Sequence, residues 1–239
     1  MAQPTLDHPT RGSARSAREV RDVRIPPIGL AGTLQVPAGA QALVVFVHGS
    51  GSSRFSPRNV AVADALNERG IATLLFDLLT ADEEADRANV FDIQLLAERL
   101  VQVVHWLDEE PVVGGLPLGL FGASTGAAAA LVAAARLGGR IGAVVSRGGR
   151  PDLAGEALDQ IRTPTLLIVG GVDFVVIELN EQAFARLMGP KALEIVQGAS
   201  HLFPEPGALE AAIGLATRWF ERHLRPDPMP RDRAARAQS

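Results

Sequence analysis

Short apolar runs alternate with segments of helical periodicity along most of this chain. The apolar runs have the length of strands, and they occupy residues 42–47, 71–76, 116–121, 141–145, 165–169 and 193–196. Because few polar residues interrupt them, we expect strands that are buried on both faces, as in a parallel sheet.

Helical segments fall between these strands. Residues 58–69 predict one helix, and residues 127–135 predict an alanine-rich one. Between Phe91 and Leu107, apolar residues recur at helical spacing with polar residues between them, which is typical of a helix with one core face. Apolar residues between Leu209 and Phe220 predict a closing helix. The alternation of strand and helix predicts an α/β fold with a mostly parallel central sheet.

Two further strands are predicted near the N-terminus, at residues 20–28 and 30–36. Pro26, Pro27 and Gly29 turn the chain between them, so we expect a short antiparallel pair at the edge of the sheet. The central sheet then has about eight strands, with helices on both of its faces.

Composition favours a single domain over residues 20–224. The chain has 239 residues, of which 47% are hydrophobic, and this length suits one large core. Residues 1–19 are rich in Ser, Arg, Pro and Thr, and residues 225–239 are rich in Pro, Arg and Ala. We expect both segments to be flexible tails.

Charge and composition exclude several classes of protein. The formal net charge is -4 and no basic patch is interleaved with aromatic residues, so we expect no nucleic-acid partner. There is no cysteine, which excludes disulfides, a thiolate zinc site and a cysteine nucleophile. No apolar run is long enough for a membrane span, and no secretory signal is recognisable near Met1, so we expect a cytoplasmic protein without membrane insertion.

The segment Gly122-Ala-Ser-Thr-Gly126 carries the strongest chemical signal. It lies between an apolar strand and an alanine-rich helix, which is the context in which a G-x-S-x-G motif holds a serine nucleophile. The sharp turn favours glycine at both flanking positions. Serine is also a common N-cap, and this structural role is the alternative for Ser124.

Asp173 and His201 follow in the order expected of a Ser-Asp-His triad. Imidazole titrates near neutral pH, so His201 is the candidate base that accepts the proton of Ser124, and Asp173 is the candidate partner of the other ring nitrogen. Asp77 and Asp152, which also follow strands, are alternatives to Asp173.

His48 is the alternative base to His201. It ends a strand inside a glycine-rich loop, and there we expect it to make a structural hydrogen bond.

These residues support a resemblance to a known family. Across residues 20–224 the chain resembles an α/β-hydrolase and is most similar to the dienelactone hydrolase family, on His48-Gly-Ser-Gly51, the segment around Ser124, Asp173 and His201. Dienelactone hydrolases proper have a cysteine nucleophile, whereas serine stands here. Many relatives with this fold insert a cap domain after the strand at 141–145, but this chain has room there only for a loop and a short helix at 152–160. We therefore expect no cap domain and a pocket that opens directly to solvent.

Two backbone amides are candidates for the oxyanion hole. In this chemistry one donor follows the nucleophile and the other lies in the loop after an early strand, which corresponds to Thr125 and Ser50.

Four arginines follow strands whose carboxyl ends border the expected pocket: Arg54, Arg58, Arg147 and Arg150. Arg54 and Arg147 are the candidates for binding a substrate carboxylate. The alternative is a solvated surface role, because arginine supplies nearly all the basic residues. The acidic cluster Asp82-Glu-Glu84 with Asp86 predicts a solvated loop, and we expect no metal site.

The sequence thus predicts a serine hydrolase that cleaves a small-molecule carboxylic ester or lactone through an acyl-enzyme intermediate, without metal or organic cofactor. Two alternatives stay open. One is a non-enzymatic binding or regulatory protein on the same fold, and the other is an acyltransferase, thioesterase or amidase with the same triad.

Overall fold

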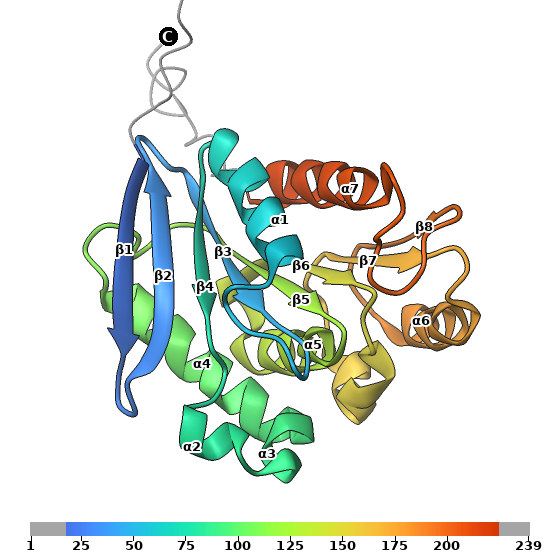
Figure 1. The fold of residues 1–239 in the computed structure, drawn as a ribbon, viewed down its shortest axis with the longest axis horizontal. Helices are drawn as coiled ribbons and strands as arrows, with labels where there is room; N and C mark the ends of the chain where they lie inside the picture. Colours follow the sequence, from blue (N-terminus) through green and yellow to red (C-terminus); the bar gives the residue numbers. More distant parts are fainter. Residues whose placement is uncertain (1–17, 225–239) are drawn as a thin grey trace, which may run out of the picture.

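An eight-stranded sheet runs through the centre of the structure, a computed structural model that describes residues 18–224 (Figure 1). The strands are β1 (Arg18–Ile25), β2 (Leu30–Pro37), β3 (Ala42–Val47), β4 (Ile71–Phe76), β5 (Leu118–Ala123), β6 (Ile141–Arg147), β7 (Thr165–Gly170) and β8 (Lys191–Val196). Their order across the sheet is β1-β2-β4-β3-β5-β6-β7-β8. The predicted tails lie outside the described residues, apart from Arg18 and Glu19, which belong to β1.

The strand directions confirm the predicted sheet. β1 pairs with β2, and β2 with β4, in antiparallel fashion, whereas all pairs from β4 to β8 are parallel. β3, β4, β5 and β7 are buried at every position, because helices cover both faces of the sheet. Parallel strands end at the same edge, so the loops after β3, β5, β6, β7 and β8 meet there.

The helices are α1 (Pro57–Glu68), α2 (Ala81–Glu84), α3 (Arg87–Phe91), α4 (Ile93–Glu109), α5 (Thr125–Leu137), α6 (Phe174–Arg186) and α7 (Ala208–His223), with 3-10 helices η1 (Gly138–Arg140) and η2 (Pro151–Gln160). One apolar core joins the sheet to α1 and α7, and another joins it to α4, α5, η2 and α6. The helices therefore form a layer on each face of the sheet (Figure 1).

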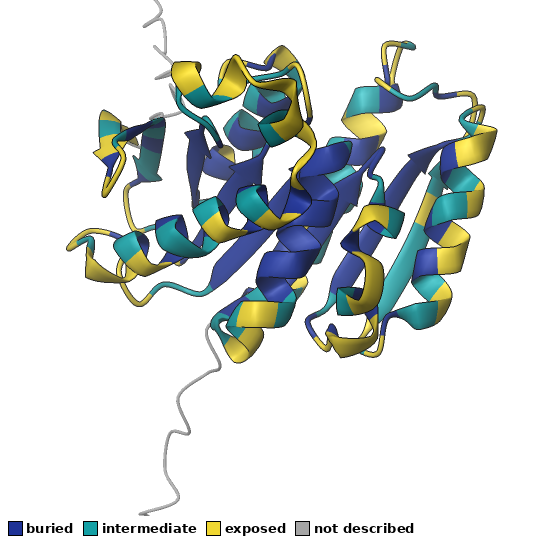
Figure 2. Cartoon of the chain, turned by 90° about the horizontal axis from the view of Figure 1, so that it is seen from below, coloured by how far each residue is buried: buried dark blue, intermediate teal, exposed yellow. Residues whose placement is uncertain are grey.

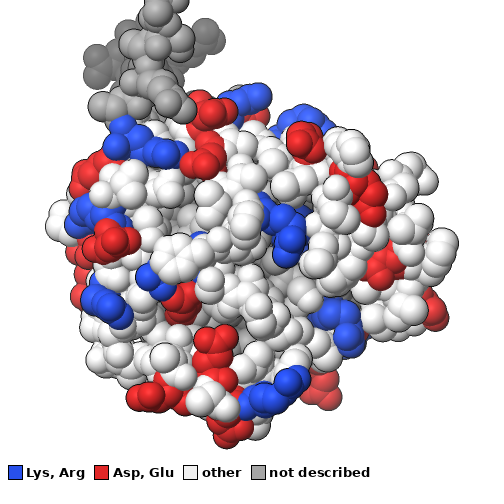
Figure 3. Space-filling view, in the orientation of Figure 1, with Lys and Arg blue, Asp and Glu red and all other residues white. Residues whose placement is uncertain are grey.

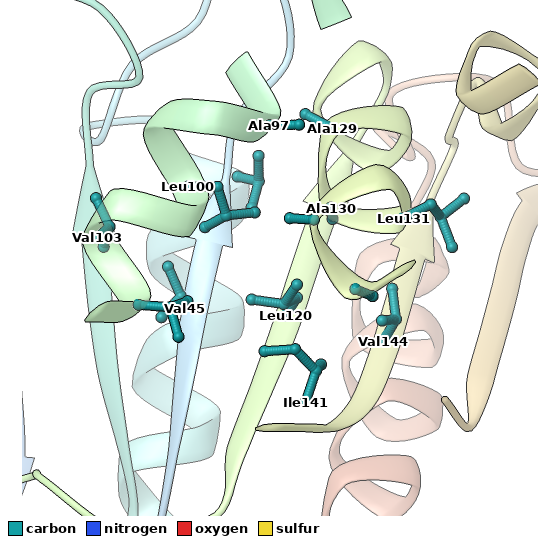
Figure 4. Close-up of a cluster of buried hydrophobic side chains, with 14 of the residues drawn as sticks. Val45, Ala97, Leu100, Val103, Leu120, Ala129, Ala130, Leu131, Ile141 and Val144 are labelled. Atoms are coloured by element: carbon teal, nitrogen blue, oxygen red, sulfur yellow. The ribbon is translucent and has the colours of Figure 1, made fainter. Parts of the chain in front are cut away.

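Helix α5 is the most deeply buried helix of the fold. Its residues from Thr125 to Ala134 are all buried, and Figure 2 shows this helix as a dark blue rod between its neighbours. Small side chains such as Ala129 and Ala130 let α5 approach α4, where Ala97 and Leu100 face it (Figure 4). This packing anchors the helix that begins directly after Ser124.

Three local features differ from the sequence prediction. Helix α6 was not predicted, because its first residues lack a clear helical periodicity. Phe174 and Val175 are apolar but 74% and 71% exposed, whereas the adjacent Val176 is buried. The acidic segment that was expected to be a loop forms α2, with a capping box between Thr80 and Glu83. Glu83 is not simply solvated, since it forms a half-buried ion pair of 2.5 Å with Arg99.

The segment between β6 and β7 contains only η2, so no cap domain covers the sheet edge at this point. Within residues 18–224 no helix is both long enough and apolar enough to cross a membrane.

Candidate active site

Ser124 occupies a sharp turn between β5 and α5. Its φ angle is 51°, a left-handed conformation that serine rarely adopts. Although Ser124 stands at the N-cap position of α5, its side chain caps no backbone amide. The structure therefore gives no support to the alternative that Ser124 serves as a capping residue, and the strained turn is typical of a functional position.

The glycines on either side of Ser124 permit this turn. A Cβ atom on Gly122 would run into the backbone of Ala127, and one on Gly126 would collide with the carbonyl oxygens of Val47 and His48. The absence of a side chain at Gly122 lets the turn pack against α5, and its absence at Gly126 lets the turn pack against the end of β3.

Asp173 and His201 come together at the carboxyl edge of the sheet. Asp173 follows β7 and immediately precedes α6, whereas His201 lies in the loop after β8. The Nδ1 atom of His201 donates to Oδ2 of Asp173 over 2.7 Å, and the carboxylate side chain is only 17% exposed. This contact fixes the ring so that Nε2 is the nitrogen left for another partner.

Ser124 and His201 border the same short segment after β6. The Ser124 amide donates to the carbonyl of Arg147 at 3.3 Å, and a Cβ atom on Gly148 would lie 3.7 Å from Cε1 of His201. Within residues 18–224 no direct hydrogen bond joins the Ser124 hydroxyl to His201. Catalytic hydrogen bonds are often long in ligand-free enzymes and shorten when substrate binds.

The alternative acids have other partners. Asp77 accepts hydrogen bonds from the amide and the guanidinium of Arg54. Asp152 forms a bidentate pair with Arg150, at 2.7 and 2.8 Å. The structure thus brings Asp173, and neither of these carboxylates, to His201.

The two candidate oxyanion donors are adjacent. The Ser50 amide donates to Oγ1 of Thr125 at 2.9 Å, and this hydrogen bond joins the loop after β3 to the first residue of α5. Gly49 also lies against Ser124, because a Cβ atom on Gly49 would be 2.9 Å from that of Ser124. Both donors were predicted from the sequence, but the hydrogen bond from the Ser50 amide to the Thr125 hydroxyl was not.

His48 makes the structural hydrogen bonds that were expected of it. Its Nε2 accepts from the Leu78 amide at 3.2 Å, so Nδ1 carries the proton and donates to the Gly49 carbonyl at 3.0 Å. Burial is the main cause that lowers the pKa of His48. A neutral His48 therefore supports the loop that carries Ser50, and the hydrogen bonds of its ring go to Gly49 and Leu78.

The candidate substrate-binding arginines have different environments. Arg54 forms an ion pair with Asp77, and its role in binding a substrate carboxylate stays a prediction. Arg147 is only 5% exposed, so the alternative of a solvated surface role is wrong for this residue. An arginine at the end of a strand looks the same in sequence whether it faces solvent or the protein interior.

A cavity of about 150 Å³ adjoins the loop after β3. Its polar side is lined by the loop from His48 to Ser53 and by Asp77 and Glu84, and its apolar side is lined by Leu78, Leu79, Ala81, Val90 and Leu96. The sequence did not identify these apolar residues as part of a site, because they come from separate elements and have the pattern of ordinary core positions.

The model of the dienelactone hydrolase family matches residues 30–222, which include Ser124, Asp173 and His201. The chain belongs to the dienelactone hydrolase family. The predicted family resemblance and the α/β fold are both confirmed.

Solved structures agree with this assignment. A dienelactone hydrolase from Anabaena variabilis, known from a crystal structure, is 52% identical in sequence to this chain. The structures match with a TM-score of 0.84, over 88% of this chain and 100% of that one. Est1E from Butyrivibrio proteoclasticus is 18% identical, with a TM-score of 0.72 and coverage of 85% and 98%. At that identity the likeness shows the fold alone.

Two curated proteins from strains of Mycobacterium tuberculosis, provisionally named phosphoribosyl transferases, are 59% identical to the chain over 198 residues. The match covers 83% of this chain but 45% of theirs, so the chain spans less than half the length of these relatives. Their name therefore applies to longer proteins, and this sequence does not match more than half of their length.

Proposed function

We propose that this family member is a serine hydrolase that cleaves carboxylic esters or lactones of small molecules. The observation that carries the proposal is the 2.7 Å hydrogen bond between His201 and Asp173, beside a serine with a φ angle of 51°. A nucleophile, a base and a residue that orients the base are the minimum set for acyl transfer through serine.

In the proposed reaction, Oγ of Ser124 attacks the carbonyl carbon of the ester while Nε2 of His201 accepts its proton. Collapse of the tetrahedral intermediate breaks the bond to the alcohol oxygen, and His201 returns the proton to that oxygen. Water then attacks the acyl-enzyme, again losing a proton to His201, which passes it to Ser124 as the acid leaves. Asp173 stabilises the imidazolium in both halves and keeps its own charge.

The developing negative charge on the carbonyl oxygen requires amide donors. The amide of Thr125 lies at the N-terminus of α5, where the helix dipole favours negative charge. The Ser50 amide is the second candidate donor, and the hydrogen bond between it and the Thr125 hydroxyl holds the loop after β3 next to the start of α5. Each donor is worth about 3 kcal/mol in the transition state.

The cavity beside Ser50 suggests the size of the substrate. At about 150 Å³ it accommodates a small acyl or alcohol group, and its walls at Leu78, Leu79, Val90 and Leu96 favour an apolar one. Since no cap domain stands between β6 and β7, small soluble esters can reach Ser124 directly.

Labelling by a fluorophosphonate tests the proposal. We expect the wild-type protein to be labelled and Ser124→Ala not to be, while Gly139→Ala, whose added methyl group meets no atom within 4 Å, keeps the label. A wild-type protein that neither reacts with the probe nor hydrolyses short p-nitrophenyl esters would instead favour a binding protein.

Product analysis separates hydrolysis from acyl transfer. With a short ester in buffer that also contains an alcohol, amine or thiol acceptor, a hydrolase releases mainly the free acid. Mainly acylated acceptor would show a transferase that uses the same triad. Matched oxygen esters, thioesters and amides then establish which leaving group is preferred.

A further inference from the structure

Arg147 is a buried cation without an acidic partner. It is the last residue of β6, and its Nη2 atom lies 3.4 Å from the Oδ1 atom of Asn59, while its Nε has no hydrogen-bond partner among the described residues. Its guanidinium lies 5.6 Å from the ring centre of Phe203. Within residues 18–224 no carboxylate lies within ion-pair distance of it. Burying an unpaired charge lowers the free energy of unfolding, so a buried arginine without a carboxylate partner indicates a role other than stabilising the fold.

A second arginine, Arg58, increases the free-energy cost of burying the charge of Arg147. Arg58, on the first turn of α1, is half-buried, and its Nε also lacks a partner in the described part of the chain. Burial, and then the neighbouring charge of Arg58, lower the pKa of Arg147 to about 10. In contrast, Arg54, Arg150 and Arg186 each pair with a carboxylate. Exposed arginines such as Arg24 and Arg87 also lack an ion pair, but among the described arginines that are buried or half-buried only Arg58 and Arg147 have no carboxylate partner.

The N-terminus of α1 adds positive potential at the same place. The helix has 12 residues, and its N-cap Ser56 makes no side-chain hydrogen bond to the first turn. Asn59, which contacts Arg147, belongs to that turn. Figure 3 shows a basic patch beside the N-terminal end of α1 with uncharged residues around it. Unsatisfied amides at a helix start favour an anion.

This positive cluster adjoins the candidate catalytic residues. The backbone carbonyl of Arg147 accepts from the Ser124 amide at 3.3 Å, and the next residue, Gly148, lies against His201. Phe203, which the Arg147 guanidinium faces, is two residues after His201 in the sequence. The cluster therefore lies at the same edge of the sheet as Ser124 and His201.

We propose that Arg58, Arg147 and the first turn of α1 bind a phosphate group of the ester substrate. The proposal rests on the proposed hydrolase function. Two guanidinium charges and a helix end worth about half a charge are balanced by a phosphate monoester, which carries about two negative charges at neutral pH. A carboxylate, with one negative charge, leaves one arginine uncompensated. Arginine also matches the geometry of phosphate oxygens through paired N–H donors.

Binding of inorganic phosphate tests the subsite without any turnover. By calorimetry near pH 7.5, we expect phosphate to bind the wild-type protein at least about tenfold more tightly than acetate. Arg58→Gln and Arg147→Gln should each weaken phosphate binding by about tenfold or more, whereas Arg186→Gln, a matched change in a surface ion pair, should bind like the wild type. Arg58→Gln keeps the test decisive if the buried variant fails to fold.

Hydrolysis of three matched esters tests whether the phosphate belongs to the substrate. The compounds are meta-acetoxyphenyl phosphate, meta-acetoxybenzoate and the neutral meta-acetoxyanisole. We expect the phosphate ester to have the lowest KM, by at least about tenfold, and Arg58→Gln to raise the KM of the phosphate ester at least about tenfold more than it raises the KM of the neutral ester.

The outcomes distinguish the subsite from the hydrolase function. Equal binding of acetate and phosphate, or wild-type phosphate binding in both arginine variants, would overturn the subsite. Phosphate binding that depends on the arginines and persists in Ser124→Ala, with none of the esters cleaved, would support the subsite and contradict the hydrolase function. Tight phosphate binding without a KM preference would overturn its role in substrate recognition.

Discussion

The Nδ1 atom of His201 lies 2.7 Å from Oδ2 of Asp173, although 28 residues separate them in the chain. The contact depends on β7 and β8 being parallel neighbours, so that the loops after both strands reach the same edge of the sheet. Because a carboxylate is an acceptor only, it holds His201 with the proton on Nδ1 and leaves Nε2 facing away as an acceptor. This tautomer is the one that a base for Ser124 requires.

Replacing Asp173 by Asn should therefore remove activity with little effect on folding. An amide can donate to Nδ1 and so favours the wrong tautomer, for which we expect kcat for a short p-nitrophenyl ester to fall by about 10³-fold to 10⁴-fold. Steady-state kinetics and thermal unfolding of the same preparations check this. Asp152→Asn is the control, since Asp152 pairs with Arg150 and not with His201. Comparable losses in the two variants would contradict the role of Asp173.

Gly126→Ala should destabilise the protein as well as inactivate it. The added methyl group would collide with the carbonyl oxygens of Val47 and His48, so the turn at Ser124 must shift away from the end of β3. We expect the free energy of unfolding to fall by about 1–3 kcal/mol, the usual cost of overpacking. Chemical denaturation measures this, and ester hydrolysis should be lost in parallel.

Gly139→Ala provides the matched comparison. A Cβ atom there has nothing within 4 Å, and the backbone is not in the left-handed region. This change should leave activity as it is and keep stability within about 1 kcal/mol of the wild type. If Gly126→Ala proved equally harmless, the close approach of the turn to β3 would not be needed.

The catalytic candidates could be predicted from sequence because their signals are local. Ser124 stands in a five-residue pattern between a strand and a helix, and His201 and Asp173 follow strands whose carboxyl ends must share an edge. The short helix α2 also has a local signal, the Thr80-to-Glu83 spacing of a capping box.

Other features of the site depend on packing between distant segments. The apolar side of the cavity combines Leu78 after β4 with Val90 on α3 and Leu96 on α4, and none of these residues differs from an ordinary core position in sequence. The burial of Arg147 depends on where α1 and Phe203 lie relative to β6. Because arginine is common throughout this chain, its sequence position could not separate the buried residue from the surface ones.

Thr125→Val should reduce turnover by loosening the link between the two candidate oxyanion donors. Valine has nearly the same shape but cannot accept the hydrogen bond that the Ser50 amide makes at 2.9 Å. A neutral hydrogen bond contributes about 0.5–1.5 kcal/mol, so we expect kcat/KM to fall by up to about tenfold, mainly through kcat. Thr125→Ser keeps the hydroxyl and should stay close to the wild type in the same assay. A valine variant as active as the serine one would show that this link does not position the donors.

His48 should make the stability of the protein depend on pH. Burial lowers the pKa of His48 below its ordinary value of 6.5 and outweighs the opposite effects of Gly49, Asp77 and Glu84. Above that value the ring is neutral in both the folded and the unfolded chain, and its contribution to stability is fully present. As the pH falls through 6.5, the unfolded chain binds a proton first, so this contribution is progressively lost.

His48→Gln isolates this effect from all other titrating groups. The glutamine oxygen can accept from the Leu78 amide as Nε2 does, but it binds no proton in this range. Between about pH 7.5 and pH 5, urea unfolding should show a smaller loss of unfolding free energy in His48→Gln than in the wild type. Equal losses in the two proteins would mean that His48 titrates alike in the folded and unfolded chains, against the buried, neutral ring that supports the Ser50 loop.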